Sequence, residues 1–181
     1  GGGAPINPAM TAGGSKIPSR DKSYDQFQPK ISLTTTAENT TVYASYGVGF
    51  RSGGFNSSGS AALINSQLNI PVSAGLGVSD SFNKEVSKSF EVGFKGRYLD
   101  GRLAINGAIF ETEVDDNQFF EFFAGPWGLL RVVTSIDQLD ISGSELDFKY
   151  ALTDSIRLDG GIGYTDGEIK KNAHRPNTVG N

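Results

Sequence analysis

Very few residues of this chain could carry out chemistry, and they stand far apart in the sequence. The one histidine, His174, lies in the segment KNAHRPNTVGN with no nucleophile-elbow motif nearby, which gives no support to Ser-His-Asp catalysis. The chain has no cysteine, so it can form neither a thiolate metal site nor a disulfide. We therefore predict that the protein is not an enzyme and that it holds no cofactor.

Two motifs that often bind ligands lack the surroundings they need. The run Asp115-Asp116-Asn117 offers oxygen ligands, but no ordered loop with six or more donors surrounds it, so we expect no metal site there. Residues 47–49 and 160–163 are glycine-rich, but both lie inside predicted strands with no helix after them, so neither forms a phosphate-binding loop. We expect glycine in these strands to make room for neighbouring aromatic rings.

Four aromatic residues stand in or beside glycine-rich segments. Phe55 follows two glycines, and Phe119, Phe122 and Trp127 belong to the stretch FFEFFAGPW. Aromatic side chains at a pocket rim give a large contact area at low entropic cost, so these four are candidates for ligand capture in loops. The stretch 119–123 also fits the top of a strand with an aromatic girdle, which is the interpretation we favour.

Composition and charge exclude several classes of protein. The 181 residues include 16 Lys+Arg and 20 Asp+Glu with the signs interspersed, so there is no basic patch for a nucleic-acid partner. No stretch approaches the ~20 consecutive apolar residues that a membrane-spanning helix requires. Strands that are apolar on one face only are not excluded by that test.

The elements that must position these residues are β-strands. The chain is rich in Gly, Thr, Ser, Phe and Tyr, which favours an all-β fold. Four segments alternate apolar and polar residues with a period of two, as strands with one apolar face do. They are residues 41–52, 86–98, 102–113 and 155–169.

Two further predicted strands are less regular. Residues 30–37 alternate weakly and precede the next strand by a tight connection, as a hairpin partner does. Within 130–150 the apolar phase changes, because Leu139 and Ile141 are odd-numbered whereas Leu146 is even-numbered. Either a bulge lies near Gly143 or the upper half of the strand rises above the apolar zone.

The connections differ in length at the two ends of the predicted sheet. Short turns at 38–40, 99–102 and 152–155 alternate with long loops at 53–85 and 115–129. Short turns at one end and long loops at the other are typical of outer-membrane barrels. A soluble antiparallel sandwich is the alternative, and it predicts that Val42, Tyr46, Phe94 and Phe148 are buried against a second sheet.

Four segments resemble the barrel domain of TonB-dependent outer-membrane receptors. They are residues 42–56, 89–103, 141–148 and 161–169, in the expected order and with the expected gaps. The resemblance implies a location in the bacterial outer membrane and a 22-stranded barrel whose lumen is closed by an N-terminal plug domain. It also implies uptake of a scarce solute, most often a ferric siderophore or similar chelate, driven by the TonB-ExbB-ExbD complex.

Eight charged residues of the polar face are then expected to line the barrel lumen, where they contact water and a plug rather than the solute itself. These are Arg51, Glu91, Lys95, Arg97, Glu145, Asp147, Arg157 and Asp159.

The sequence also departs from the family pattern. We identify no plug domain and no segment that would pair with the energy-transducing protein, and six strands are too few to close a membrane barrel. We therefore expect a partial barrel over 29–169, with hairpins at 30–52, 86–123 and 130–169, which is either a fragment of a receptor or a segment completed by other polypeptide. Residues 1–28 are expected to be an extracellular loop or a disordered lead-in, and 170–181 the start of the next extracellular loop. Sugar oligomers and cobalamin remain possible solutes. The alternative functions are a passive porin-like channel and a soluble extracellular β-sandwich that acts as a binding module.

Overall fold

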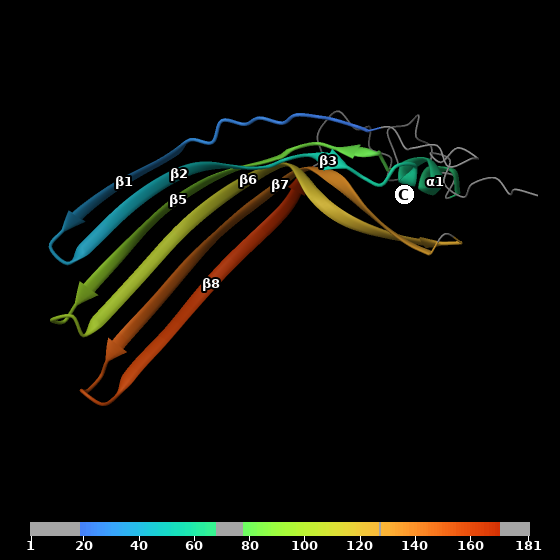
Figure 1. Ribbon diagram of the computed structural model, residues 1–181. Helices are drawn as coiled ribbons and strands as arrows, with labels where there is room; N and C mark the ends of the chain where they lie inside the picture. The colour runs from blue at the N-terminus through green and yellow to red at the C-terminus, as the bar shows by residue number, and fades with distance from the viewer. Residues whose placement is uncertain (1–18, 68–77, 127, 171–181) are drawn as a thin grey trace, which may run out of the picture.

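The computed structural model describes residues 19–67, 78–126 and 128–170, and these residues form mainly one curved antiparallel sheet (Figure 1). Its six strands lie in the order β1-β2-β5-β6-β7-β8, so each pairs with its neighbour in the sequence except where β3, α1 and β4 intervene. The six strands are β1 (Lys30–Ala37), β2 (Thr40–Arg51), β5 (Glu85–Tyr98), β6 (Leu103–Gly125), β7 (Gly128–Ala151) and β8 (Arg157–Lys170).

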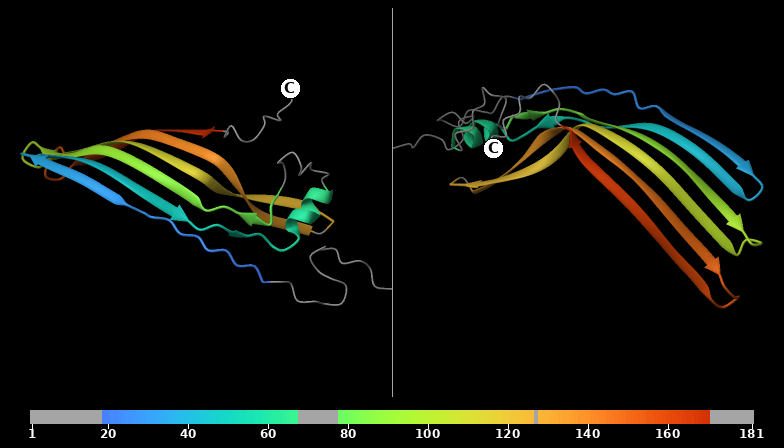
Figure 2. Two further views of the ribbon diagram at one scale, coloured as in Figure 1. Left: turned by 90° about the horizontal axis from the view of Figure 1, so that it is seen from above. Right: turned by 180° about the vertical axis from the view of Figure 1, so that it is seen from behind.

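The six predicted strands are confirmed, but one predicted long loop is wrong. Residues 115–129 are not a loop, because β6 continues to Gly125 and β7 begins at Gly128. The aromatic and β-branched residues on both sides of this turn have high strand propensity and pair across the hairpin. Figures 1 and 2 show that the outer part of this hairpin leaves the sheet close to the point where β8 ends.

The other predicted long loop, 53–85, contains regular structure that the sequence analysis missed. It holds β3 (Gly54–Phe55), the helix α1 (Ser60–Gln67) and β4 (Ser81–Phe82), with β3 and β4 paired. The helix is short and is stabilised from outside, since the backbone N–H of Ala61 donates to Asp80 Oδ1 at 3.1 Å. No helix among the residues described is long and apolar enough to cross a membrane.

The register of β7 resolves its change of phase. Pairing with β6 and β8 is continuous through Gly143, which lies opposite Phe110 on one side and Thr165 on the other. No bulge interrupts the strand there, so Leu139 and Ile141 face the same side of the sheet as Glu145. The second alternative is therefore correct, and the upper half of β7 lies beyond the apolar zone.

Cross-strand pairing divides the lower part of the sheet into two faces. The apolar face carries rows such as Val42, Phe94, Gly107, Leu146 and Ile162, which are direct partners on successive strands. The charged face carries the residues between them, because side chains alternate along each strand. The apolar face is uncovered among the described residues, with Val42 44% and Phe148 42% exposed, so the sandwich interpretation is wrong.

The apolar band runs obliquely across the strands. On β2 it extends from Val42 to Phe50. Followed across the sheet, the row of Val42 reaches Ile162 on β8, and the row of Phe50 reaches Lys170. On β8 itself the band extends from Leu158 to Tyr164. From β2 to β8 its lower edge has thus moved by four residues and its upper edge by six.

Both faces change character above this band. On the formerly apolar face the next rows are acidic, and on the formerly charged face the corresponding rows are apolar. The upper rows of the first face include Glu111, Glu113, Asp115, Asp140, Asp166 and Glu168, and those of the second include Phe110, Val114, Leu139, Ile141 and Ile169.

Candidate functional site

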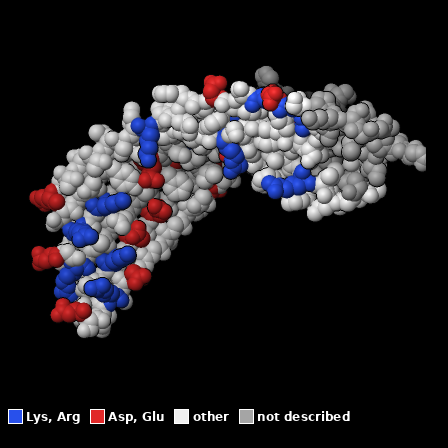
Figure 3. Space-filling view, viewed as in Figure 1, with Lys and Arg blue, Asp and Glu red and all other residues white. Residues whose placement is uncertain are grey.

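The eight charged residues singled out in the sequence lie on one face of the sheet. Register places Glu91, Lys95, Glu145 and Asp147 on the same side, and the remaining four belong to the same alternating set. Figure 3 shows Lys and Arg interspersed with Asp and Glu over the sheet. A wall with mixed charge is wetted by water and offers many hydrogen-bonding partners without a strong net field.

Contacts on this charged face join small, separate groups of side chains. Arg51 forms an ion pair with Glu85 at 3.6 Å, and the Asn106 side chain donates to Asp147 Oδ1 at 3.0 Å. Lys95 lies over the ring of Tyr43, with 5.7 Å between its Nζ and the ring centroid. The face is therefore a scaffold of separate polar groups and does not gather them into a reactive centre.

Ion pairs mark the upper edge of the apolar band on the opposite face. Lys88 Nζ lies 2.6 Å from Glu113 Oε1 and 3.0 Å from Asp115 Oδ2, and Lys170 pairs with Asp140. Asp115, considered above as an oxygen ligand, is thus bonded to a protein cation. The other two residues of that run also meet protein groups, since Asp116 accepts from Asn83 and Asn117 donates to Glu85.

Replacing Lys88 with methionine is expected to cost little stability, about 1 kcal/mol or less, because both carboxylate partners are partly exposed and screened by water. Methionine keeps the apolar stem and removes only the charge. Urea titration at low and high salt checks this, and the difference between variant and wild type should shrink at high salt. A salt-independent loss of several kcal/mol would contradict the assignment of Lys88 to an exposed ion-pair cluster.

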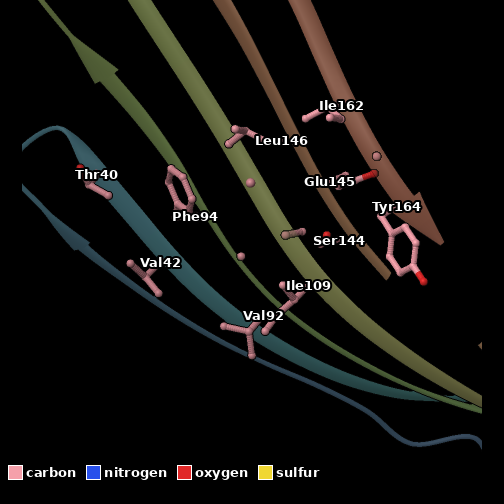
Figure 4. A pocket seen from close by; sticks show the side chains of 14 residues that line it. Thr40, Val42, Val92, Phe94, Ile109, Ser144, Glu145, Leu146, Ile162 and Tyr164 are labelled. Carbon is pink, nitrogen blue, oxygen red and sulfur yellow. The ribbon is translucent and has the colours of Figure 1, made fainter. Parts of the chain in front are cut away.

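The apolar face also contains a hollow that the sequence did not indicate (Figure 4). It has a volume of about 770 Å³, and its lining includes Gly107, where an added Cβ would lie 2.7 Å from the Phe94 ring. Its lining is largely hydrocarbon, so it suits an apolar partner and not a charged solute. Its lining includes the apolar or aromatic side chains of Val42, Val92, Phe94, Ile109, Leu146, Ile162 and Tyr164.

The part of the β6–β7 hairpin beyond Asp116, residues 117–136, is called the projecting hairpin here, and its two faces differ. One face packs against the loop that holds α1, where Phe123, Leu130 and Val132 meet the buried Ile64. The other face is open and presents Phe120, Phe122, Leu129 and Arg131, which we call the aromatic face. The Arg131 guanidinium lies 3.9 Å from the centroid of the Phe120 ring, a cation–π contact.

The structure only partly gathers the four predicted capture residues. Phe119 and Phe122 both lie in strand β6, as the girdle interpretation favoured, but the alternation of side chains places them on opposite faces. Phe122 is 62% exposed on the aromatic face. Phe55 lies in β3 with Arg20 stacked 4.8 Å from its ring centroid, and Trp127 lies outside the described residues.

Two residues that the sequence analysis did not single out hold this region together. Asn56 is buried and its side chain bonds to Ser79 and Val133, while Arg20 donates to the backbone carbonyls of Asn56 and Asp80. A lone Asn after Gly-Gly-Phe has no spacing signal, so only the fold reveals its partners. The prediction for residues 1–28 is untested for 1–18, but the described part is anchored, since Tyr24 donates to Phe82 O.

Comparison with known proteins supports the fold and the family. The family model for the TonB dependent receptor-like β-barrel matches residues 7–181. Among solved structures, the Copper transporter OprC aligns with a TM-score of 0.56 and 20% identity over 77% of this chain. This chain spans only 20% of the length of that protein. The chain therefore belongs to the TonB-dependent receptor β-barrel family, whose members lie in the bacterial outer membrane.

Proposed function

We propose that this chain forms part of the barrel wall of an outer-membrane receptor that actively imports a scarce, metal-containing solute. In this proposal the charged face lines the lumen and the apolar band faces lipid. The remaining strands and a plug domain come from polypeptide outside this chain, and energy comes from the TonB-ExbB-ExbD complex through those segments. The function is transport and not catalysis.

The observation that carries this proposal is the slant of the apolar band. Barrel strands that tilt by ~40° and lie ~4.8 Å apart should shift a membrane-parallel band by ~4 Å, or about 1.2 residues, at each strand. Four steps from β2 to β8 then give a shift of about five residues. The observed shifts of four and six residues agree with tilted strands in a bilayer.

The solute is proposed to be a ferric siderophore or a similar chelate. The aromatic face offers rings and one guanidinium in an open position, which suits a planar, anionic, partly apolar ligand better than a bare ion. A copper-containing solute is the nearest rival, because the solved structure of similar fold is named a copper transporter.

Uptake by cells that carry the complete receptor tests the function. Cells are given radiolabelled iron as a ferric chelate, or copper, with and without a working TonB complex. Accumulation of the iron chelate that disappears without the complex supports active import, and copper accumulation alone would redirect the solute assignment. Uptake that is unchanged without the complex would mean a passive porin-like channel, and the proposal would be wrong.

Removing the rings of Phe120 and Phe122 together is expected to weaken solute binding by about thirtyfold, since two aromatic anchors that each contribute on the order of 1 kcal/mol together contribute about 2 kcal/mol. Binding of the ferric chelate to the purified receptor measures the effect. Phe27→Ala is the matched control, because Phe27 is an equally large exposed ring outside the projecting hairpin. Equal effects of the double variant and the control would remove the aromatic face from the capture site.

A further inference from the structure

The Asn56 side chain sits at a junction between two segments far apart in the sequence. Only 6% of Asn56 is exposed, and its amide uses both kinds of hydrogen-bonding group. Nδ2 donates to Val133 O at 2.9 Å and to Ser79 O at 2.8 Å, while Oδ1 accepts from Val133 N at 2.7 Å. A buried amide with all three bonds made is expensive to disturb, because each lost partner leaves a desolvated polar group.

The two bonds to Val133 imitate strand pairing. Strand β8 pairs with β7 only as far as Gln138, so Val133 lies on a stretch of β7 that β8 does not reach. There the amide of Asn56 occupies the place that a peptide group of a neighbouring strand would take. An edge closed in this way is also less able to pair with a foreign strand.

The surrounding contacts tie Asn56 to the helix and to the segment before β1. Asn56 N donates to Asp80 O at 2.9 Å, and the carboxylate of Asp80 caps α1. Arg20 donates to Asn56 O at 2.7 Å and to Asp80 O at 3.3 Å. A small apolar cluster of Ile64, Val78 and Val132 lies in the same region. Polar and apolar contacts therefore both join the loop that holds α1 to the projecting hairpin.

We propose that Asn56 is a positioning residue that couples the α1 loop, residues 53–67 and 78–84, to the projecting hairpin, so that the two move as one unit. One consequence concerns binding: the aromatic face is held in place before the solute arrives, which lowers the entropy cost of capture. That consequence rests on the proposed function, whereas the coupling itself does not.

The chain supplies a matched control for this coupling. The Asn65 side chain bonds to the backbone of Val78 in the same manner, donating to Val78 O at 2.8 Å and accepting from Val78 N at 2.9 Å. Both groups of that pair belong to the α1 loop. Asn65→Leu therefore removes the same chemistry within the loop, whereas Asn56→Leu removes it between the loop and the hairpin.

Hydrogen–deuterium exchange of the complete receptor in lipid tests the coupling without any solute. Asn56→Leu is expected to raise exchange at least tenfold both in α1 and along the projecting hairpin, including β6 residues that Asn56 does not touch. Asn65→Leu should raise exchange in α1 and at Val78 but affect the hairpin much less than Asn56→Leu does, because Val78 meets the hairpin only through its packing with Val132. If Asn56→Leu affects Val133 alone, or if both variants affect the hairpin equally, the coupling role is wrong.

Spin labels at Ala62 in α1 and Ala124 near the hairpin turn give a second measurement, because both positions are exposed. The distance distribution should be narrow in the otherwise unaltered receptor and should broaden with Asn56→Leu. An unchanged distribution would overturn the proposal even if exchange rises. If the unaltered receptor shows the coupling but no TonB-dependent uptake, the proposed function is wrong and the coupling stands. The two failures can therefore be told apart.

Discussion

Replacing Ile162 with arginine is expected to destabilise the folded receptor in a bilayer by about 2 to 4 kcal/mol, because arginine near the midplane of a membrane barrel must leave water or distort the lipid. This corresponds to a change of roughly 30- to 1000-fold in the folding equilibrium. In water the same substitution would cost little, since Ile162 is 74% exposed on the surface of the sheet. The size of the effect therefore reports which solvent covers the apolar face.

Two control variants on the same strand separate the effect of depth in the membrane from the effect of the sheet face that carries the arginine. Gly163→Arg introduces the same side chain on the adjacent, charged face, where its added Cβ would be 3.8 Å from the nearest atom. It should cost much less, because that face is lined with polar groups and water. Leu158→Arg lies at the lower edge of the apolar band and should cost about 0 to 1 kcal/mol, as expected near an interface.

Urea titration of the complete receptor in lipid vesicles measures all three variants. The expected order of destabilisation is Ile162→Arg, then Leu158→Arg, then Gly163→Arg. If Gly163→Arg is the most costly, the two faces have been assigned in the wrong sense. Equal, small costs would mean that neither face meets hydrocarbon, and the membrane interpretation of the slanted band would fail.

The strands of the lower sheet could be predicted from the sequence because their pattern has a single physical cause. Within the apolar band each residue of 90–98 or 157–164 faces either the apolar or the charged side, so a period of two is imposed there. The hairpin turn at Asp100-Gly101 could be predicted equally well, because glycine is favoured where φ is positive and Gly101 has a φ of +84°. The eight charged residues follow from the same alternation and therefore share one face.

Above the apolar band the same reasoning failed, also for a physical reason. The projecting hairpin is covered on one face by a loop and not by lipid or by the lumen, so its residues obey no simple alternation of apolar and charged side chains. Phe119 to Phe123 are all large or charged, and both faces can use them. The sequence predicts that the glycine-proline run at 125–128 is part of a long loop, whereas Gly125 ends β6 and Gly128 begins β7.

The role of Asn56 could not have been predicted from spacing at all. Its partner Val133 is 77 residues away in the chain. A single buried amide leaves no periodic trace, and neither Phe55, which ends the two-residue strand β3, nor Ser57 marks its position. The helix α1 escaped prediction for a related reason, because its cap comes from Asp80 and lies outside the helical segment itself.

Replacing Gly143 with alanine is expected to destabilise the barrel by about 1 to 3 kcal/mol, the usual cost of overpacking. A Cβ at this position would lie 2.5 Å from the Phe110 ring and 2.5 Å from the backbone carbonyl oxygen of Tyr164. The ring could rotate away, but the carbonyl belongs to the paired strand β8 and cannot move without disturbing the register. The strain must therefore be absorbed by the sheet.

Gly167→Ala is the matched control, because Gly167 lies on β8 and on the same face, and an added Cβ there meets nothing within 4 Å. This variant should be neutral or slightly stabilising, since alanine lowers the entropy of the unfolded chain. Urea midpoints of both variants in lipid check the pair, and equal midpoints would contradict the close approach of Phe110. Because Gly143 stands where the charged face becomes apolar, only a glycine there leaves room for the Phe110 ring without breaking the pairing of β7 with β8.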